Sequence, residues 1–137
     1  MTTSIISVAN QKGGVAKTTS VCNLGASYGM NGQKVLLIDF DYQFNLTSLI
    51  GINENKAKEH SIAKIISDGA SIADLIVPTE LENVDLVPSS RSLNDVREKI
   101  SGEINQFHFL KEALESDFIN QYEIVIKIGR ASCRERV

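Results

Sequence analysis

The sequence predicts an α/β fold with a mostly parallel sheet and helices on both of its faces. Three observations predict it: unbroken apolar runs typical of buried parallel strands, helix-periodic segments between them, and a glycine-containing loop after the first run. The chain has 137 residues, 42% hydrophobic and 23% charged, which suits one domain with a buried core. These fractions exclude a disordered or low-complexity chain.

The N-terminal part of the chain reads as a βαβ unit. The β-branched run Ile5–Val8 is predicted to be a buried strand, and it ends at the loop 10–14, NQKGG. Residues Thr18–Met30 carry small and apolar side chains at helical spacing, and Asn31-Gly32 ends this helix as a left-handed C-cap does. The continuous apolar run Lys34–Asp39 is typical of a strand inside a parallel sheet.

The rest of the chain alternates short helices with strands, which favours an open α/β sheet. Helices are expected at Asn45–Ile50, Ser61–Ile66, Leu93–Ile100 and Phe107–Leu114, and strands at Val84–Pro88 and Tyr122–Ile126. The sequence contains no apolar run near the roughly 20 residues that a membrane span needs, and no basic and apolar leader. We therefore expect a cytoplasmic protein without a transmembrane segment.

The segment Lys12–Thr19, KGGVAKTT, lies between a strand and a helix, where a phosphate-binding loop belongs. Lys17 would reach the β- and γ-phosphates of a nucleotide, and the Thr18 hydroxyl would bind Mg²⁺. The usual P-loop spacing is broken, because Gln11 and Ala16 stand where glycines are expected. A solvated turn with two surface lysines is the alternative, but two lysines in one loop favour an anion between them.

Together with the preceding Asn10-Gln11, KGGVAKTT resembles the deviant Walker A motif of ParA/MinD-type P-loop ATPases, in particular the ParA/Soj partition branch. The segment Val35–Thr47, VLLIDFDYQFNLT, is similar to the second motif of that branch, and Val84–Ser89 supports the match. The resemblance covers residues 3–126. It implies a P-loop NTPase-like fold and an ATP-hydrolysing protein of chromosome or plasmid partition.

The resemblance also implies roles for individual residues. Lys17 would be the phosphate-binding lysine, and Lys12 the signature lysine that reaches the partner's phosphates in a nucleotide-sandwich dimer. The residues expected to bind ATP are Lys12, Gly13, Gly14, Val15, Ala16, Lys17, Thr18 and Thr19. The expected catalytic residues are Lys12, Lys17 and Asp41, and the expected Mg²⁺ ligands are Thr18, Asp39 and Asp41.

Asp39 and Asp41 stand at the two acidic positions expected after the second strand. In the family the second of these orients the attacking water and both support the metal site. Carboxylates at positions i and i+2 of a strand end share one face, beside the loop after the first strand; a solvated turn is the alternative. Tyr42 and Phe44 replace the family's proline and small residue, which predicts a different local loop and an altered hydrolysis rate.

The resemblance further implies an ATP-dependent homodimer that binds DNA non-specifically, a ParB-like adaptor and a cytoplasmic, nucleoid-associated location. Two alternatives stay open. One is a MinD-like membrane-associated ATPase that positions the division site or cell pole, which would need an amphipathic C-terminal helix. The other is an inactive truncated fragment.

The end of the chain differs in charge from the rest. Residues 127–137, KIGRASCRERV, hold four basic side chains and one acidic, whereas residues 1–126 hold ten basic and sixteen acidic. The family would place an aspartate where Lys127 stands. We therefore expect residues 1–126 to be the N-terminal part of a ParA-type domain that is incomplete at its C-terminus. Residues 127–137 are expected to be a read-through tail, and the family's adenine, DNA and dimer contacts to lie in a missing half.

Overall fold

The computed structural model describes residues 2–9, 15–99 and 103–129. In these residues five strands form one sheet in the order β1-β5-β2-β4-β3. The strands are β1 (Ser4–Ala9), β2 (Val35–Phe40), β3 (Val77–Pro78), β4 (Val84–Val87) and β5 (Ile124–Gly129). All neighbours pair in parallel except the short edge strand β3, which is antiparallel to β4. The expected mostly parallel sheet is confirmed.

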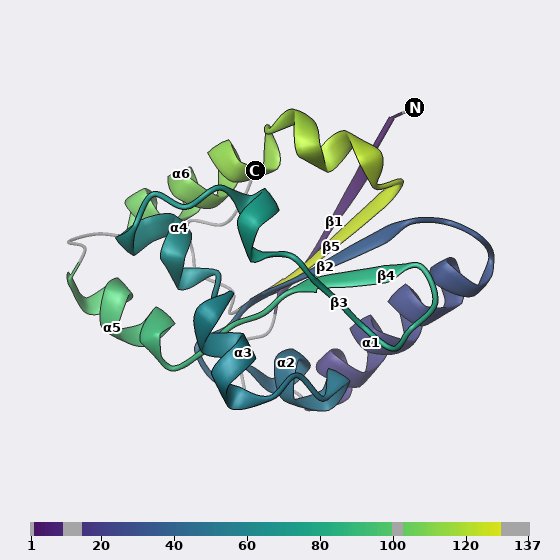
Figure 1. Ribbon diagram of the computed structural model, residues 1–137, viewed down its shortest axis with the longest axis horizontal. Helices are drawn as coiled ribbons and strands as arrows, with labels where there is room; N and C mark the ends of the chain where they lie inside the picture. Colours follow the sequence, from purple (N-terminus) through teal and green to yellow (C-terminus); the bar gives the residue numbers. More distant parts are fainter. Residues whose placement is uncertain (1, 10–14, 100–102, 130–137) are drawn as a thin grey trace.

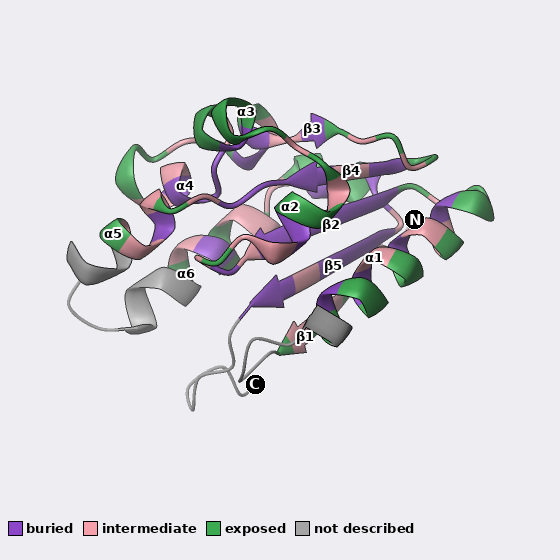
Figure 2. Cartoon of the chain, turned by 90° about the horizontal axis from the view of Figure 1, so that it is seen from below, coloured by how far each residue is buried: buried purple, intermediate pink, exposed green. Residues whose placement is uncertain are grey.

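Helices cover both faces of this sheet, as expected (Figures 1 and 2). They are α1 (Val15–Met30), α2 (Asn45–Ile50), α3 (Glu54–Glu59), α4 (Ala63–Ser67), α5 (Ser92–Lys99) and α6 (Glu103–Leu114), with 3₁₀ turns η1 (Ile72–Leu75) and η2 (Asp117–Gln121). Side chains alternate along β2, so that Val35 and Leu37 pack towards α1 and α2, and Leu36 and Ile38 towards α4, α5 and α6. This double burial explains why β2 reads as one continuous apolar run.

Strand β5 lies between β1 and β2, although it follows every other described strand in the sequence. Ala9 of β1 and Phe40 of β2 both pair with Gly129, so the carboxyl ends of β1 and β2 are level on either side of β5. At the usual strand spacing these two ends are about 10 Å apart. The segments that follow β1 and β2 therefore meet at one edge of the sheet, which is where ligands bind in open α/β folds.

Several elements differ in extent from the expectation. Helix α1 begins at Val15 rather than Thr18, and α3, η1, β3 and η2 had no counterpart in the sequence analysis. Strand β5 begins at Ile124, because the preceding residues form η2, where Tyr122 N–H donates to the Ile119 carbonyl. It continues to Gly129, so the boundary expected after Ile126 falls inside a strand. That boundary itself stays a prediction.

Helix α1 packs closely against the sheet and the turn before β4. A Cβ atom added to Gly25 would lie 3.0 Å from Leu37 Cδ2, and one added to Gly29 would lie 2.0 Å from the Glu82 carbonyl oxygen. Asn83, at a φ of 61°, donates its side-chain N–H to the Gly29 carbonyl over 2.9 Å. These contacts fix the C-terminal half of α1 and thereby help to aim its N-terminus at the end of β1.

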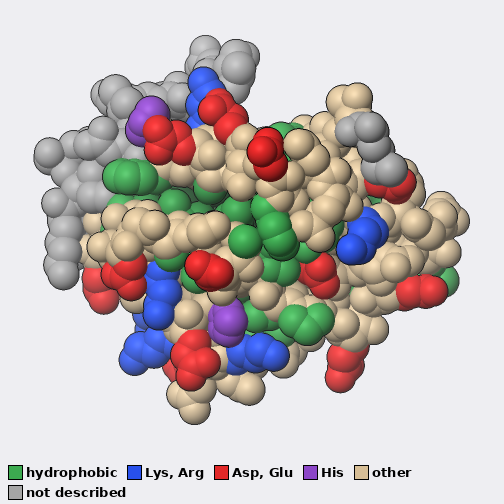
Figure 3. All heavy atoms as spheres, turned by 45° about the horizontal axis from the view of Figure 1, so that its top comes forward, with side chains coloured by type: hydrophobic (Ala, Val, Ile, Leu, Met, Phe, Trp, Pro, Cys, Tyr) green, Lys and Arg blue, Asp and Glu red, His purple; other side chains and the backbone are tan. Residues whose placement is uncertain are grey.

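The outer surface carries charges of both signs. On the face in Figure 3, the described Lys and Arg side chains are interspersed with Asp and Glu, and apolar side chains lie between them. A large single-sign basic patch, which DNA binding favours, is not seen among the described residues on this face. None of the helices in the described ranges is long and apolar enough to span a membrane.

The contact at Gly29 predicts the cost of adding one methyl group. Gly29→Ala should lower the free energy of unfolding by about 1–3 kcal/mol, because backbone rather than a flexible side chain must move. Gly25→Ala in the same helix is the matched control, with a smaller loss, since its added Cβ meets only the end of Leu37. Urea unfolding measures both, and a Gly29→Ala protein as stable as the wild type would contradict this packing.

Candidate active site

Lys17 lies at the end of β1. It belongs to the first turns of α1, and its Nζ atom donates a hydrogen bond to the Ala9 carbonyl oxygen over 2.8 Å. Thr18 beside it is buried, whereas Thr19 is exposed. Val15 and Ala16 begin α1. The structure thus places an ammonium group and a helix N-terminus at this edge of the sheet, an arrangement that attracts anions.

Three of the expected ATP-binding residues, Lys12, Gly13 and Gly14, lie outside the described residues. Their roles stay predictions.

The two aspartates of the second motif lie at the end of β2. Asp39 is the penultimate residue of the strand rather than a residue after it, and Asp41 follows the strand. Asp39 is 0% exposed and Asp41 5% exposed, so neither lies in a solvated turn. Asp41 N–H donates to Asp39 Oδ1 over 3.2 Å, and Gln43 N–H donates to Asp41 Oδ1 over 3.0 Å. The two carboxylates are therefore neighbours in a site with little water.

Burial raises the pKa of Asp39 to about 7. The hydroxyl and the N–H of Thr47 lower this pKa, through hydrogen bonds to Oδ2 of 2.6 and 3.0 Å, and the negative charge of Asp41 raises it. Placing two carboxylates side by side away from water is unfavourable unless a cation balances them. The site therefore has the electrostatic character of a cation-binding site.

Two hydroxyl residues without a role in the sequence analysis complete this arrangement. Thr47 Oγ1, which donates to Asp39, accepts a hydrogen bond from Ser89 N–H over 2.9 Å. Ser89 Oγ donates to the Asp41 carbonyl oxygen over 2.7 Å. Both residues are fully buried or nearly so. Nothing in the sequence marks either residue as part of a site, because their hydrogen bonds join segments far apart in the chain.

Phe44 departs from the family at a position where the backbone favours glycine. Its φ is 43° and its ψ 39°, in the left-handed region, and it precedes α2. The turn around it is nevertheless closed, because the Phe44 N–H donates to the Asp41 carbonyl over 2.9 Å and the Phe44 carbonyl accepts from the Ser48 N–H over 3.0 Å. The backbone at Phe44 is therefore strained. How this loop differs from that of the family, and how the difference affects the hydrolysis rate, stays a prediction.

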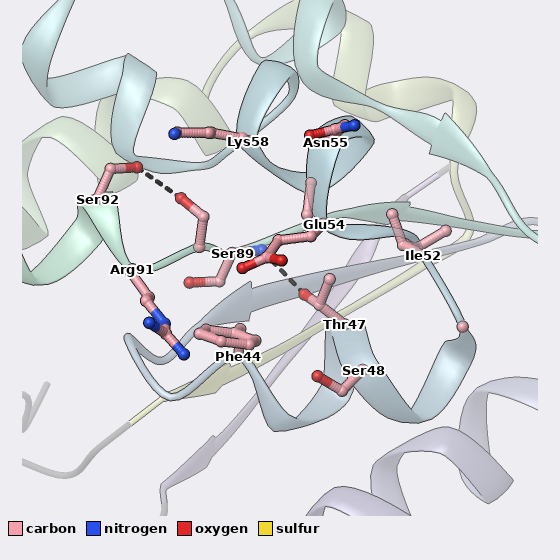
Figure 4. A pocket seen from close by; sticks show the side chains of 13 residues that line it. Phe44, Thr47, Ser48, Ile52, Glu54, Asn55, Lys58, Ser89, Arg91 and Ser92 are labelled. Carbon is pink, nitrogen blue, oxygen red and sulfur yellow. Dashed lines mark hydrogen bonds between the residues drawn. The ribbon is translucent and has the colours of Figure 1, made fainter.

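A cavity of about 730 Å³ lies beside this network, between α2, α3 and the segment that follows β4 (Figure 4). Its lining includes the charged side chains of Glu54, Lys58 and Arg91. Thr47 and Ser89 also line it, and Figure 4 shows the hydrogen bond between them. The side chains that hold the carboxylates are thus part of the cavity wall.

The expected Mg²⁺ ligands, Thr18, Asp39 and Asp41, are all buried oxygen donors, and Mg²⁺ prefers oxygen. The described residues hold no group of three or more His, Cys, Asp and Glu that could bind a metal alone. Two neighbouring carboxylates are nevertheless typical of Mg²⁺ that is shared with substrate phosphates, and Thr18 as a third ligand stays a prediction. These residues fit Mg²⁺ bound together with a nucleotide.

Comparison with known proteins identifies the family. The family model AAA_31, described as an AAA domain, matches residues 3–128. The chain belongs to this ParA/MinD-type family. The sporulation initiation inhibitor protein Soj of Bacillus subtilis is 40% identical over 122 residues, which cover 89% of this chain and 48% of Soj. The chain therefore spans about half the length of this curated relative.

Solved structures of the family share the fold. Cobyrinic acid a,c-diamide synthase from Mycobacterium smegmatis, with bound ATP analogue and magnesium, has a TM-score of 0.81 at 32% identity, over 92% of this chain and 50% of that one. A Borrelia burgdorferi plasmid partition protein bound to AMPPNP has a TM-score of 0.77 at 31% identity, with 96% and 55% covered. MinD from Pyrococcus horikoshii, complexed with Mg-ADP, has a TM-score of 0.72 at 26% identity, over 97% of this chain and 51% of MinD. The P-loop NTPase-like fold is confirmed.

The strained turn of this AAA domain predicts an inverted order of stability at position 44. Alanine is normally more stable than glycine, but Phe44→Gly should be more stable than Phe44→Ala by about 1 kcal/mol, because only glycine adopts the left-handed backbone freely. Urea unfolding of both variants measures this. Asn45→Gly and Asn45→Ala are the control pair, because Asn45 is the first residue of α2, and there the alanine variant should be the more stable. An alanine variant that is also the more stable at position 44 would contradict the strain.

Proposed function

We propose that this chain is the nucleotide-binding part of a ParA/Soj-type partition ATPase that binds and hydrolyses ATP with Mg²⁺. The observation that carries the proposal is the buried pair Asp39 and Asp41 at the end of β2, level with the end of β1 where Lys17 lies. The similarity to Soj and to the nucleotide-bound partition protein supports it.

In this proposal the motif residues bind the phosphates, hold Mg²⁺ and orient the attacking water. Lys12–Thr19 bind the phosphates, with Lys17 as the cation on the β- and γ-phosphates and Lys12 acting across a dimer. Thr18, Asp39 and Asp41 hold Mg²⁺, which would neutralise phosphate charge. Asp41 also orients the attacking water. Phosphoryl transfer depends mainly on such positioning and charge neutralisation, and the buried carboxylates and the α1 N-terminus supply both.

The wider activity belongs to a full-length protein. We propose an ATP-dependent homodimer that controls non-specific DNA binding, a ParB-like adaptor that stimulates hydrolysis, and a nucleoid-associated location in the cytoplasm. Residues 1–126 are proposed as the N-terminal part of the ATPase domain, although residues 127–129 complete strand β5 within the same sheet. Lys127 stands where the family's third motif has an aspartate, so we expect the 137-residue chain alone to lack ATP turnover.

A MinD-like ATPase at the membrane is the second candidate, and the similarity to MinD favours it. The two candidates differ in what the ATP-bound protein binds. A partition protein should bind duplex DNA, whereas a MinD-like protein should sediment with anionic lipid vesicles. Sedimentation of the full-length protein with each, with ATP and with ADP, distinguishes them.

Replacing Lys17 tests the phosphate-binding role. In a full-length chain that carries this segment, Lys17→Ala should weaken ATP binding about 10- to 100-fold, because a charged hydrogen-bond donor to the phosphates is lost. Titration with a fluorescent ATP analogue measures this, with the exposed Lys56→Ala as the matched control. Unchanged ATP affinity in Lys17→Ala would remove this loop from the proposal.

Replacing Asp41 separates binding from hydrolysis. Asp41→Ala should still bind ATP but lose about 100-fold or more in kcat, since the group that orients the water is gone. Phosphate release under saturating ATP measures kcat, and Asp68→Ala, an exposed aspartate distant in sequence, serves as the control. Wild-type turnover by the Asp41→Ala protein would exclude Asp41 from the mechanism.

A further inference from the structure

We propose that Thr47 is the positioning residue that sets the orientation of the Asp39 carboxylate towards Mg²⁺, and that Ser89 holds Thr47 in place. The inference rests on the proposed magnesium site. It concerns residues for which the sequence motifs gave no role, and it makes α2 and the segment after β4 structural parts of the metal site.

Thr47 holds one oxygen of Asp39 from two directions. The Thr47 hydroxyl donates to Asp39 Oδ2 over 2.6 Å, and the Thr47 N–H donates to the same oxygen over 3.0 Å. Oδ1 accepts the longer bond of 3.2 Å from the Asp41 N–H. Two bonds to one oxygen fix the rotation of the carboxylate, so Oδ2 is committed to the protein and Oδ1 is the oxygen offered to a cation.

The start of α2 also links Thr47 to Asp39. Thr47 is in the first turn of that helix, where backbone N–H groups have no partner within the helix. Phe44, the residue at the N-cap, provides no side-chain hydrogen bond. Asp39 therefore takes the part of a capping residue from another element, and its position is linked to that of the helix.

Ser89 in turn holds both Thr47 and Asp41. Its N–H donates to Thr47 Oγ1 over 2.9 Å, so the Thr47 hydroxyl proton is directed to Asp39 and its lone pair to Ser89. The Ser89 hydroxyl donates to the Asp41 carbonyl over 2.7 Å. The same two buried residues therefore hold Asp39 by its side chain and Asp41 by its backbone. Residues that orient a metal ligand in this way affect metal affinity by about 10- to 100-fold.

Thr47→Val in the full-length protein tests the proposal, because valine keeps the shape and the N–H but removes the hydroxyl. Its Mg²⁺ affinity in the presence of ATP, measured by calorimetry, should fall about 10- to 100-fold, while ATP affinity without Mg²⁺ stays unchanged. Thr47→Ser should restore Mg²⁺ affinity. Ser48→Ala, the exposed neighbour in α2, is the matched control. A merely structural role would weaken ATP binding with and without Mg²⁺ alike.

The outcomes separate this inference from the proposed function. A wild-type protein that binds no Mg²⁺ with ATP would contradict the magnesium site. If the wild-type protein binds Mg²⁺ with ATP and the Thr47→Val protein binds it with the same affinity, the positioning role alone is overturned. If Thr47→Val does not fold, Thr47→Ala replaces it, and its Mg²⁺ affinity should fall by the same factor. If Thr47→Ser binds Mg²⁺ as weakly as Thr47→Ala does, the role of the hydroxyl is overturned.

Discussion

The burial of β2 on both faces is the constraint on which the rest of the structure depends. Its apolar side chains pack against helices on either side, and its penultimate residue is Asp39, a carboxylate fully removed from water. A buried carboxylate needs hydrogen bonds or a cation. The first turn of α2 and the segment after β4 meet this need, so the packing of the sheet and the chemistry of its edge are fixed by the same strand.

The sequence predicted the elements that have strong patterns. The apolar run of β2 and the strand–loop–helix order around Lys17 were enough to predict a parallel sheet, and α2 was predicted with its observed bounds. Helix α3 and strand β3 were missed, because ENKAKE is almost entirely polar and Val77–Pro78 is too short to show alternation.

The site was predictable to the extent that single residues carry its chemistry. Lys17, Asp39 and Asp41 stand out by type and spacing, and the structure places all three at one edge of the sheet. Thr47 and Ser89 do not stand out, since a threonine in a short helix and a serine after a strand are ordinary residues. Their importance arises from hydrogen bonds between segments 42 residues apart, which a linear pattern does not contain.

The position of β5 between β1 and β2 has a consequence for how the sheet assembles. Among the described strands β1 pairs only with β5, which comes more than a hundred residues later in the chain. Each pairing with β1 closes a loop of more than a hundred residues, which makes sheet completion slow relative to local helix formation. The edge of the sheet that joins the ends of β1 and β2 would therefore be completed only after β5 has been synthesised, later than the βαβ unit that carries Lys17 and both aspartates.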